Sequence, residues 1–243
     1  MQNRYAGDIG DYVKFAILRA LAPGHRVGIA WWLFPDEGHN DDGKHVGYLS
    51  DKKEQWESFD PYLFRALKSI VNSGQRNVAA LEKSALLADA CYAFDPIPRA
   101  DQERQGWFSA LKAKLAGCSI VFVDPDNGLQ SDNKKVPLSP KSIALDELAA
   151  LSGDSRTLIV YHHQTRRKGG HLKEIGYQAD RLKRCGFRVD ALRARPFSPR
   201  VFFLLNATSD IRERAESVAR TWEGKIEWWP DPSEASMGSK TKR

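Results

Sequence analysis

The sequence predicts an α/β fold in which a mainly parallel, doubly wound sheet ends in an antiparallel strand pair. From residue 101 onward, short apolar runs typical of strands alternate with segments of helical periodicity. The last two apolar runs, residues 187–192 and 201–205, are separated by a short turn that contains Pro196 and Pro199. Such a turn is too short for a parallel crossover, so these two strands should pair antiparallel.

The first part of the chain predicts a helix, a strand and a long polar loop. Residues 11–21 carry apolar side chains at helical spacing, and Pro23-Gly24 ends that helix. Residues 26–34 form an aromatic and β-branched run that favours a strand, and the polar residues 35–45 follow it. Asp60 and Pro61 are typical of the N-cap and the first residue of a helix, which we expect to continue to residue 71.

The remaining elements alternate between helix and strand, and the chain is long enough for one sizeable core. Further helices are expected at residues 77–87, 102–116, 140–151, 173–184 and 210–222, and further strands at 119–123, 157–161, 187–192 and 201–205. We expect residues 1–230 to form one domain, and the polar residues 231–243 to be a disordered tail.

Composition excludes several classes of protein. Cys91, Cys118 and Cys185 are odd in number and far apart, which fits neither a disulfide framework nor a paired zinc motif. No apolar run approaches the roughly 20 residues that span a bilayer, and the first residues lack the apolar core of a signal peptide. We therefore expect a cytoplasmic protein without a membrane partner. The net charge of +6 favours a polyanionic partner such as nucleic acid.

The sharpest candidate for chemistry is the loop Asp124-Pro125-Asp126-Asn127-Gly128, directly after a predicted strand. Ligands of open parallel sheets bind at the carboxyl ends of strands, and this loop places two carboxylates and an amide there. The loop could be catalytic or could bind a metal. Alternatively, it is a turn whose aspartates cap the next helix. We also expect Asn206, after the last apolar strand, at the same edge.

A second candidate segment follows the strand at 157–161. His162 and His163 stand at its end, where paired histidines beside Asp124 and Asp126 would suit Zn, Mn or Fe. Basic side chains and a Gly-Gly pair that permits close backbone approach suit phosphate binding. The residues expected to hold substrate phosphate are Arg166, Arg167, Lys168 and His171. The alternatives are a solvated loop and nonspecific contact with nucleic acid.

Two N-terminal features add to these candidates. The acidic loop at 35–45 could form a metal site, gate a substrate or remain solvated; its titratable residues are Asp36, Glu37, His39, Asp41, Asp42 and His45. The pair Trp31-Trp32 before it favours the core over a base-stacking platform. Asp8 or Asp11 could cap the first helix, one turn before Lys14.

Gly7, Asp11 and Lys14 show the spacing G-x-x-x-D-x-x-K, which resembles the N-terminal signature of the RlmJ-type 23S ribosomal RNA adenine-N6 methyltransferases. The loop from Asp124 to Asn127 is similar to the family's Asp-Pro-Pro-Tyr motif, although Asp126 and Asn127 replace its second proline and its aromatic residue. The late antiparallel strand pair also fits. The chain is similar, in addition, to a set of bacterial proteins of about this length.

This resemblance implies a class I methyltransferase-like, Rossmann-like fold that binds S-adenosylmethionine. It places Lys14 and Asp11 near the cofactor, together with the loop after the first strand, in which Asp36 and Gly38 are the candidates. That loop lacks the family's glycine-rich pattern, and Phe15 stands where the family has a histidine.

Three hypotheses follow for the function. In the first, the protein is a methyltransferase-like enzyme on nucleic acid, and Asp124 polarises an amino group of the substrate. In the second, Asp124, Asp126, His162 and His163 hold a divalent metal for phosphodiester hydrolysis. In the third, the protein binds nucleic acid or another partner without turnover and shows strongly salt-dependent binding.

Overall fold

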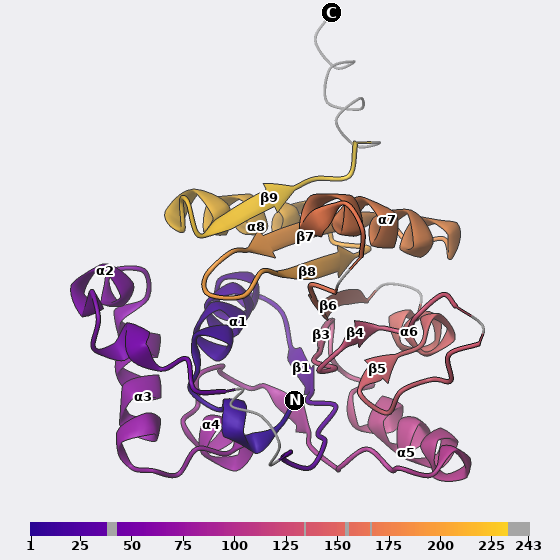
Figure 1. Ribbon diagram of the computed structural model, residues 1–243, viewed down its shortest axis with the longest axis horizontal. Coiled ribbons are helices and arrows are strands. Elements are labelled where there is room, and N and C mark those ends of the chain that lie inside the picture. Colours follow the sequence, from indigo (N-terminus) through magenta and orange to yellow (C-terminus); the bar gives the residue numbers. More distant parts are fainter. Residues whose placement is uncertain (38–42, 134, 154–155, 166, 233–243) are drawn as a thin grey trace, which may run out of the picture.

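The computed structural model describes residues 1–37, 43–133, 135–153, 156–165 and 167–232, and its centre is a seven-stranded sheet (Figure 1). The strand order is β2-β1-β3-β6-β8-β7-β9, and β4 and β5 form a separate pair. The strands are β1 (Val27–Ala30), β2 (Cys91–Ala93), β3 (Ile120–Val123), β4 (Gly128–Leu129), β5 (Ser142–Ile143), β6 (Thr157–His163), β7 (Val189–Ala194), β8 (Arg200–Leu205) and β9 (Ile226–Trp229).

The predicted fold class is confirmed by the pairing of these strands. The first four strands of the order, β2, β1, β3 and β6, run parallel. Strand β8 lies between β6 and β7 and is antiparallel to both, and β9 is antiparallel to β7. The result is a Rossmann-like, doubly wound sheet with late antiparallel strands.

Helices cover both faces of the sheet, and the sheet separates the interior into two cores. One core lies under α1 (Ile9–Leu21), α3 (Pro61–Asn72), α4 (Val78–Lys83) and α8 (Ser209–Thr221), and the other under α5 (Asp101–Lys114), α6 (Leu145–Ser152) and α7 (Gly170–Arg184). Three shorter elements, η1 (Asn3–Tyr5), η2 (Gly47–Leu49) and α2 (Lys53–Glu57), complete the described helices.

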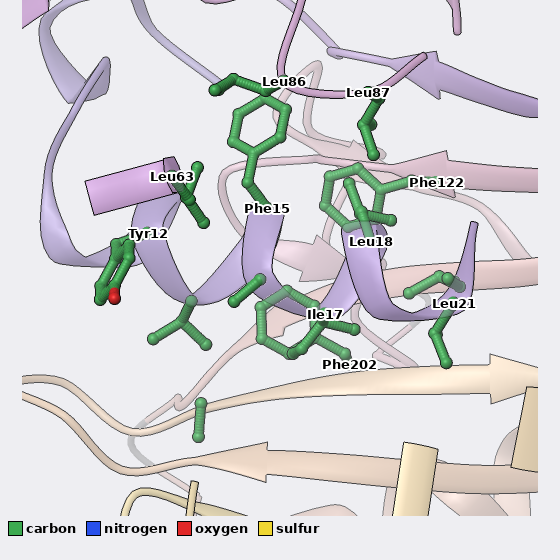
Figure 2. Close-up of a cluster of buried hydrophobic side chains, with 14 of the residues drawn as sticks. Tyr12, Phe15, Ile17, Leu18, Leu21, Leu63, Leu86, Leu87, Phe122 and Phe202 are labelled. Atoms are coloured by element: carbon green, nitrogen blue, oxygen red, sulfur yellow. The ribbon is translucent and has the colours of Figure 1, made fainter. Parts of the chain in front are cut away.

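Helix α1 is buried along almost its whole length, which fixes its position over the sheet. Figure 2 shows its apolar side chains, such as Phe15 and Ile17, among side chains of neighbouring elements, including Phe122 of β3 and Phe202 of β8. This packing places the amino end of α1, with its buried polar residues Asp11 and Lys14, at one edge of the sheet.

Two element boundaries differ from the prediction for identifiable reasons. Strand β1 ends at Ala30 rather than at residue 34, because Trp32 adopts a left-handed backbone conformation with φ 48°. Trp31 and Trp32 are both buried, one in each core, which confirms the pair as core residues. Helix α6 begins at Leu145 rather than at 140, because β5 pairs with β4.

The end of the described chain is packed against β7. Asp231 is buried, its carboxylate accepts a hydrogen bond from the backbone N–H of Val189 (3.1 Å), and its own N–H donates to Asp190 (2.7 Å). Ordered structure therefore extends into the first residue of the predicted tail, while residues 233–243 lie outside the described residues. Among the helices of the described chain, none is long and apolar enough to cross a membrane.

Candidate active site at the carboxyl edge of the sheet

A pocket of about 470 Å³ lies at the carboxyl edge of the parallel strands, beside the amino end of α1; we call it the edge pocket. Strands β3 and β6 end there, and the antiparallel β8 begins there, since His163 is paired with Arg200. Its lining is mostly polar and comprises Met1, Tyr5, Asp8, Gly10, Asp11, Lys14, Glu37, Gly43, His45, Asp124, Asp126, Asn127, Lys141, Tyr161, His163, Ser198 and Arg200.

Lys14 joins the two ends of the predicted site. Its Nζ lies 2.8 Å from Asp11 Oδ1 and 2.6 Å from Asp124 Oδ2, and all three side chains are buried. Burial alone would lower the pKa of Lys14, but the two carboxylates outweigh it and raise this pKa, so the ammonium stays charged. Burial raises the pKa of Asp124 in turn.

The spacing of Gly7, Asp11 and Lys14 has a local physical cause. Asp8 caps α1 by accepting from the N–H of Asp11 (3.0 Å), and Asp11 accepts from the N–H of Gly7 (3.1 Å). Gly7 has φ +78°, and a Cβ there would lie 2.7 Å from Val71 Cγ2. Asp11 then faces Lys14 one helical turn later, so the three residues form one connected unit.

The loop after β3 is fixed by the N-terminal residues. Asp126 contacts the amino group of Met1 (2.5 Å) and accepts from Gln2 Nε2 (2.8 Å). Burial raises the pKa of Asp126, but these partners outweigh it and lower the pKa. Asn127 is exposed at the mouth of the pocket. Neither aspartate caps the following helix, so the interpretation of this loop as a helix-capping turn is wrong.

The two predicted histidines separate to opposite sides of β6. His162 is fully buried; its Nδ1 accepts from the N–H of Leu129 (3.1 Å), and its Nε2 lies 3.2 Å from Glu174. His163 instead lines the edge pocket, with Tyr161 Oη 3.2 Å from its Nδ1 and Ser198 Oγ 3.5 Å from its Nε2. Adjacent residues of a strand point to opposite faces, which explains the separation.

The metal site expected from Asp124, Asp126 and His162 is not assembled. Both ring nitrogens of His162 are engaged on the other face of the sheet, by Leu129 and Glu174. The Lys14 ammonium lies between Asp11 and Asp124. Within the part of the chain that the structure describes, no group of three or more His, Cys, Asp or Glu side chains could hold a metal ion.

Those of the expected phosphate residues that the structure describes do not come together either. His171 is buried and accepts from Arg193 Nε (3.1 Å); burial and Arg193 lower its pKa to about 4, so it is neutral at pH 7. Arg167 stacks on the ring of Tyr177 and lines a different pocket. Lys168 is exposed and lines neither pocket, and Arg166 lies outside the described residues.

The cofactor candidates divide in the same way. Asp11 and Lys14 line the edge pocket, whereas Asp36 is exposed and accepts from the N–H of Arg4 (3.3 Å). Gly38 is outside the described residues. Asn206 was expected at this edge but lies at the opposite one, because β8 runs antiparallel and its last residue, Leu205, is paired with Leu158 at the start of β6.

Sequence reasoning missed several residues of the edge pocket. Tyr161 shares a face of β6 with His163, and burial raises its pKa to about 12. Arg200, 7% exposed, donates to the backbone oxygen of Ser198 (3.0 Å), and within the described chain no carboxylate forms an ion pair with it. The alternation of strand residues identifies Tyr161, and the predicted antiparallel pairing identifies the start of β8, so both signals were present in the sequence.

Fold and pocket together define a Rossmann-like α/β protein with a polar, charge-rich pocket at the carboxyl edge of its sheet. No family model matches the chain, and no curated protein matches it in sequence.

Proposed function

We propose that the protein is a methyltransferase that acts on nucleic acid and binds S-adenosylmethionine in the edge pocket. One observation carries the proposal. The N-terminal motif and the loop after β3, which separately resemble the RlmJ-type family, meet in one buried ion pair between Lys14 and Asp124, 110 positions apart. Two motifs that converge on one charged contact at a strand end are typical of an active site.

The pocket residues fit the cofactor. A volume of 470 Å³ lies within the range of about 300–1,000 Å³ of small-molecule sites. The Arg200 guanidinium would hold the cofactor carboxylate, and Asp8 would accept from its amino group. Gly10 supports this arrangement, because a Cβ there would lie 2.3 Å from Arg200 Nη1. The glycine therefore keeps space for the guanidinium at the pocket wall.

The cofactor would lie beside the crevice between β1 and β3, where the strand order reverses, and not within it. The backbone of Met1 occupies that crevice: its amino group donates to the carbonyl oxygens of Trp32 (3.2 Å) and Asp124 (2.9 Å), and its own oxygen accepts from Phe34. The N-terminus accordingly lies beside β1 (Figure 1). This arrangement is consistent with a chain that lacks the glycine-rich loop.

When bound, S-adenosylmethionine supplies a methyl group made electrophilic by its sulfonium. The side chains of Asp124 and Asn127 would accept hydrogen bonds from the substrate amino group and orient its nitrogen. Lys14 keeps the Asp124 carboxylate in place. His163, oriented by Tyr161 and Ser198, is the base that would receive the proton that the amino nitrogen loses.

Isothermal titration calorimetry with S-adenosylmethionine and with its demethylated product tests the proposal. Asp8→Asn keeps a capping side chain but removes the charge that faces the pocket, and we expect roughly tenfold weaker cofactor binding, as for loss of a charge-assisted hydrogen bond. Asp60→Asn, at the N-cap of α3 and outside the edge pocket, is the matched control and should bind normally.

The absence of heat with either ligand, for a wild-type sample whose fold is verified by circular dichroism, would contradict the methyltransferase proposal. Salt-dependent oligonucleotide binding in that same sample would then favour a nucleic-acid-binding protein without turnover.

A further inference from the structure

A second pocket, of about 490 Å³, lies on the other side of the end of β6; we call it the α7 pocket. Helix α7 contributes Gln178 and Arg181 to its wall, and the segment around β4 and β5 forms the opposite side. Asn127 and His163 line both this pocket and the edge pocket. The α7 pocket is therefore next to the proposed reaction centre.

Arg181 is a buried cation that forms no ion pair with a carboxylate of the described residues. It is 7% exposed, and its Nη1 donates to the backbone oxygen of Gln130 (2.9 Å) and to Gln178 Oε1 (2.8 Å). Within the described chain, its Nε and Nη2 donate no hydrogen bond. Burial lowers the pKa of Arg181, although Asp132 at the pocket wall opposes this.

Arg104 is a second buried arginine in this chain, and a carboxylate neutralises its charge. It is 8% exposed, almost the same as Arg181, but Glu147 accepts from its Nε (2.7 Å) and its Nη2 (2.8 Å). A buried charge without such a partner costs stability. The difference indicates that Arg181 is completed by an anion that arrives with a ligand.

The rest of the α7 pocket suits a phosphate. Arg167 lies at its wall, where stacking on Tyr177 orients the guanidinium. Gln164 and Thr165 add polar side chains, and Asp132 is the one carboxylate among the described lining residues. Two arginines against one carboxylate give the described lining a net positive charge. Arginine forks bind phosphate oxygens through paired hydrogen bonds.

We infer that the α7 pocket binds a backbone phosphate of a single-stranded nucleic acid, with Arg181 as its principal ligand and Arg167 as the second. The inference rests on the proposed function in one respect: the nucleotide next to this phosphate would reach Asn127, at the junction with the edge pocket. Phosphate binding itself does not depend on the cofactor.

Fluorescence anisotropy with a labelled single-stranded 12-mer, as RNA and as DNA of the same sequence, tests the inference. Arg181→Gln should weaken binding at least tenfold and reduce the salt slope by about one, because one phosphate contact is lost. Arg220→Gln removes the same charge from an exposed position on α8 and should stay within about twofold of wild type.

Wild-type affinity and salt slope in Arg181→Gln, or an equal loss in Arg220→Gln, would overturn the inference. If Arg181→Gln does not fold, Arg167→Gln decides instead, because its exposed side chain supports no core; a loss of about threefold supports the site, and no loss refutes it. Inorganic phosphate and AMP are tested as ligands by calorimetry. If they bind in an Arg181-dependent manner but the 12-mer does not bind, the pocket is a free-anion site and the inferred polynucleotide is excluded.

Calorimetry on the same samples separates this inference from the proposed function. Arg181→Gln should bind S-adenosylmethionine as wild type does, because Arg181 does not line the edge pocket. If wild-type protein binds no cofactor but its oligonucleotide binding requires Arg181, the phosphate site stands and the methyltransferase proposal falls.

Discussion

The edge pocket and the α7 pocket lie on either side of the same strand end but compensate charge in opposite ways. In the edge pocket, Lys14 is held by two carboxylates, and Asp126 is paired with the amino group of Met1. In the α7 pocket, Arg181 is buried with neutral acceptors alone among the described residues. We infer that paired charges fix the geometry of the first pocket, whereas the unpaired cation of the second is kept for a ligand.

The largest effect should come from removing the central cation of the edge pocket. Lys14→Met leaves Asp11 and Asp124 buried without a counter-ion, so we expect the free energy of unfolding to fall by about 3–5 kcal/mol at pH 7. Urea denaturation followed by circular dichroism measures it. Lys53→Met removes an exposed ion pair with Glu54 and should cost at most about 1 kcal/mol.

A loss for Lys14→Met no larger than that of the control would mean that the ion-pair network is not a structural centre. Arg181→Gln offers the opposite comparison, since no carboxylate of the described chain forms an ion pair with this cation. This substitution should lower the free energy of unfolding clearly less than Lys14→Met does. A larger loss would contradict the proposed difference in charge pairing between the two pockets.

Replacing the two histidines at the end of β6 should also affect stability unequally, but by less than Lys14→Met does. His162→Gln removes a fully buried ring that joins Leu129 and Glu174, and we expect it to lower the free energy of unfolding by about 1–3 kcal/mol. His163→Gln should change stability by less than about 0.5 kcal/mol and should instead abolish most methyl transfer. Thermal unfolding and a turnover assay give both values, and similar stability losses in the two variants would refute the assigned difference.

Much of the fold follows from the sequence, because the decisive signals are local. Alternating apolar runs predicted the doubly wound sheet, and the short turn at Pro196 predicted the antiparallel pair. Asp60-Pro61 predicted the start of α3. Short elements such as β2 and β5 have too few residues to show a period, so tertiary pairing decides them.

The candidate site was predictable where residues act through short spacings and less so where they depend on orientation. Asp124 and Lys14 were both identified, but a pattern of residue types does not show that the two form an ion pair. The grouping of His162 and His163 with the two aspartates as one metal site was wrong, since strand alternation turns the two rings to opposite faces and His162 contacts Leu129 and Glu174 instead. The role of Met1, which holds Asp126, depends on a contact between residues far apart in the chain.

The smallest effect concerns His171, which was predicted to bind phosphate beside Arg167 but is buried next to Arg193. Its pKa of about 4 lies below the usual 6.5, so the folded protein takes up this proton less readily than the unfolded chain. The contribution of neutral His171 to the free energy of unfolding is fully present above pH 6.5 and is lost as the pH falls from 6.5 toward 4. Over this window wild-type protein should lose on the order of 1–2 kcal/mol more than His171→Gln, measured by urea denaturation at successive pH values. Parallel curves for the two proteins would show that burial beside Arg193 does not lower the pKa of His171.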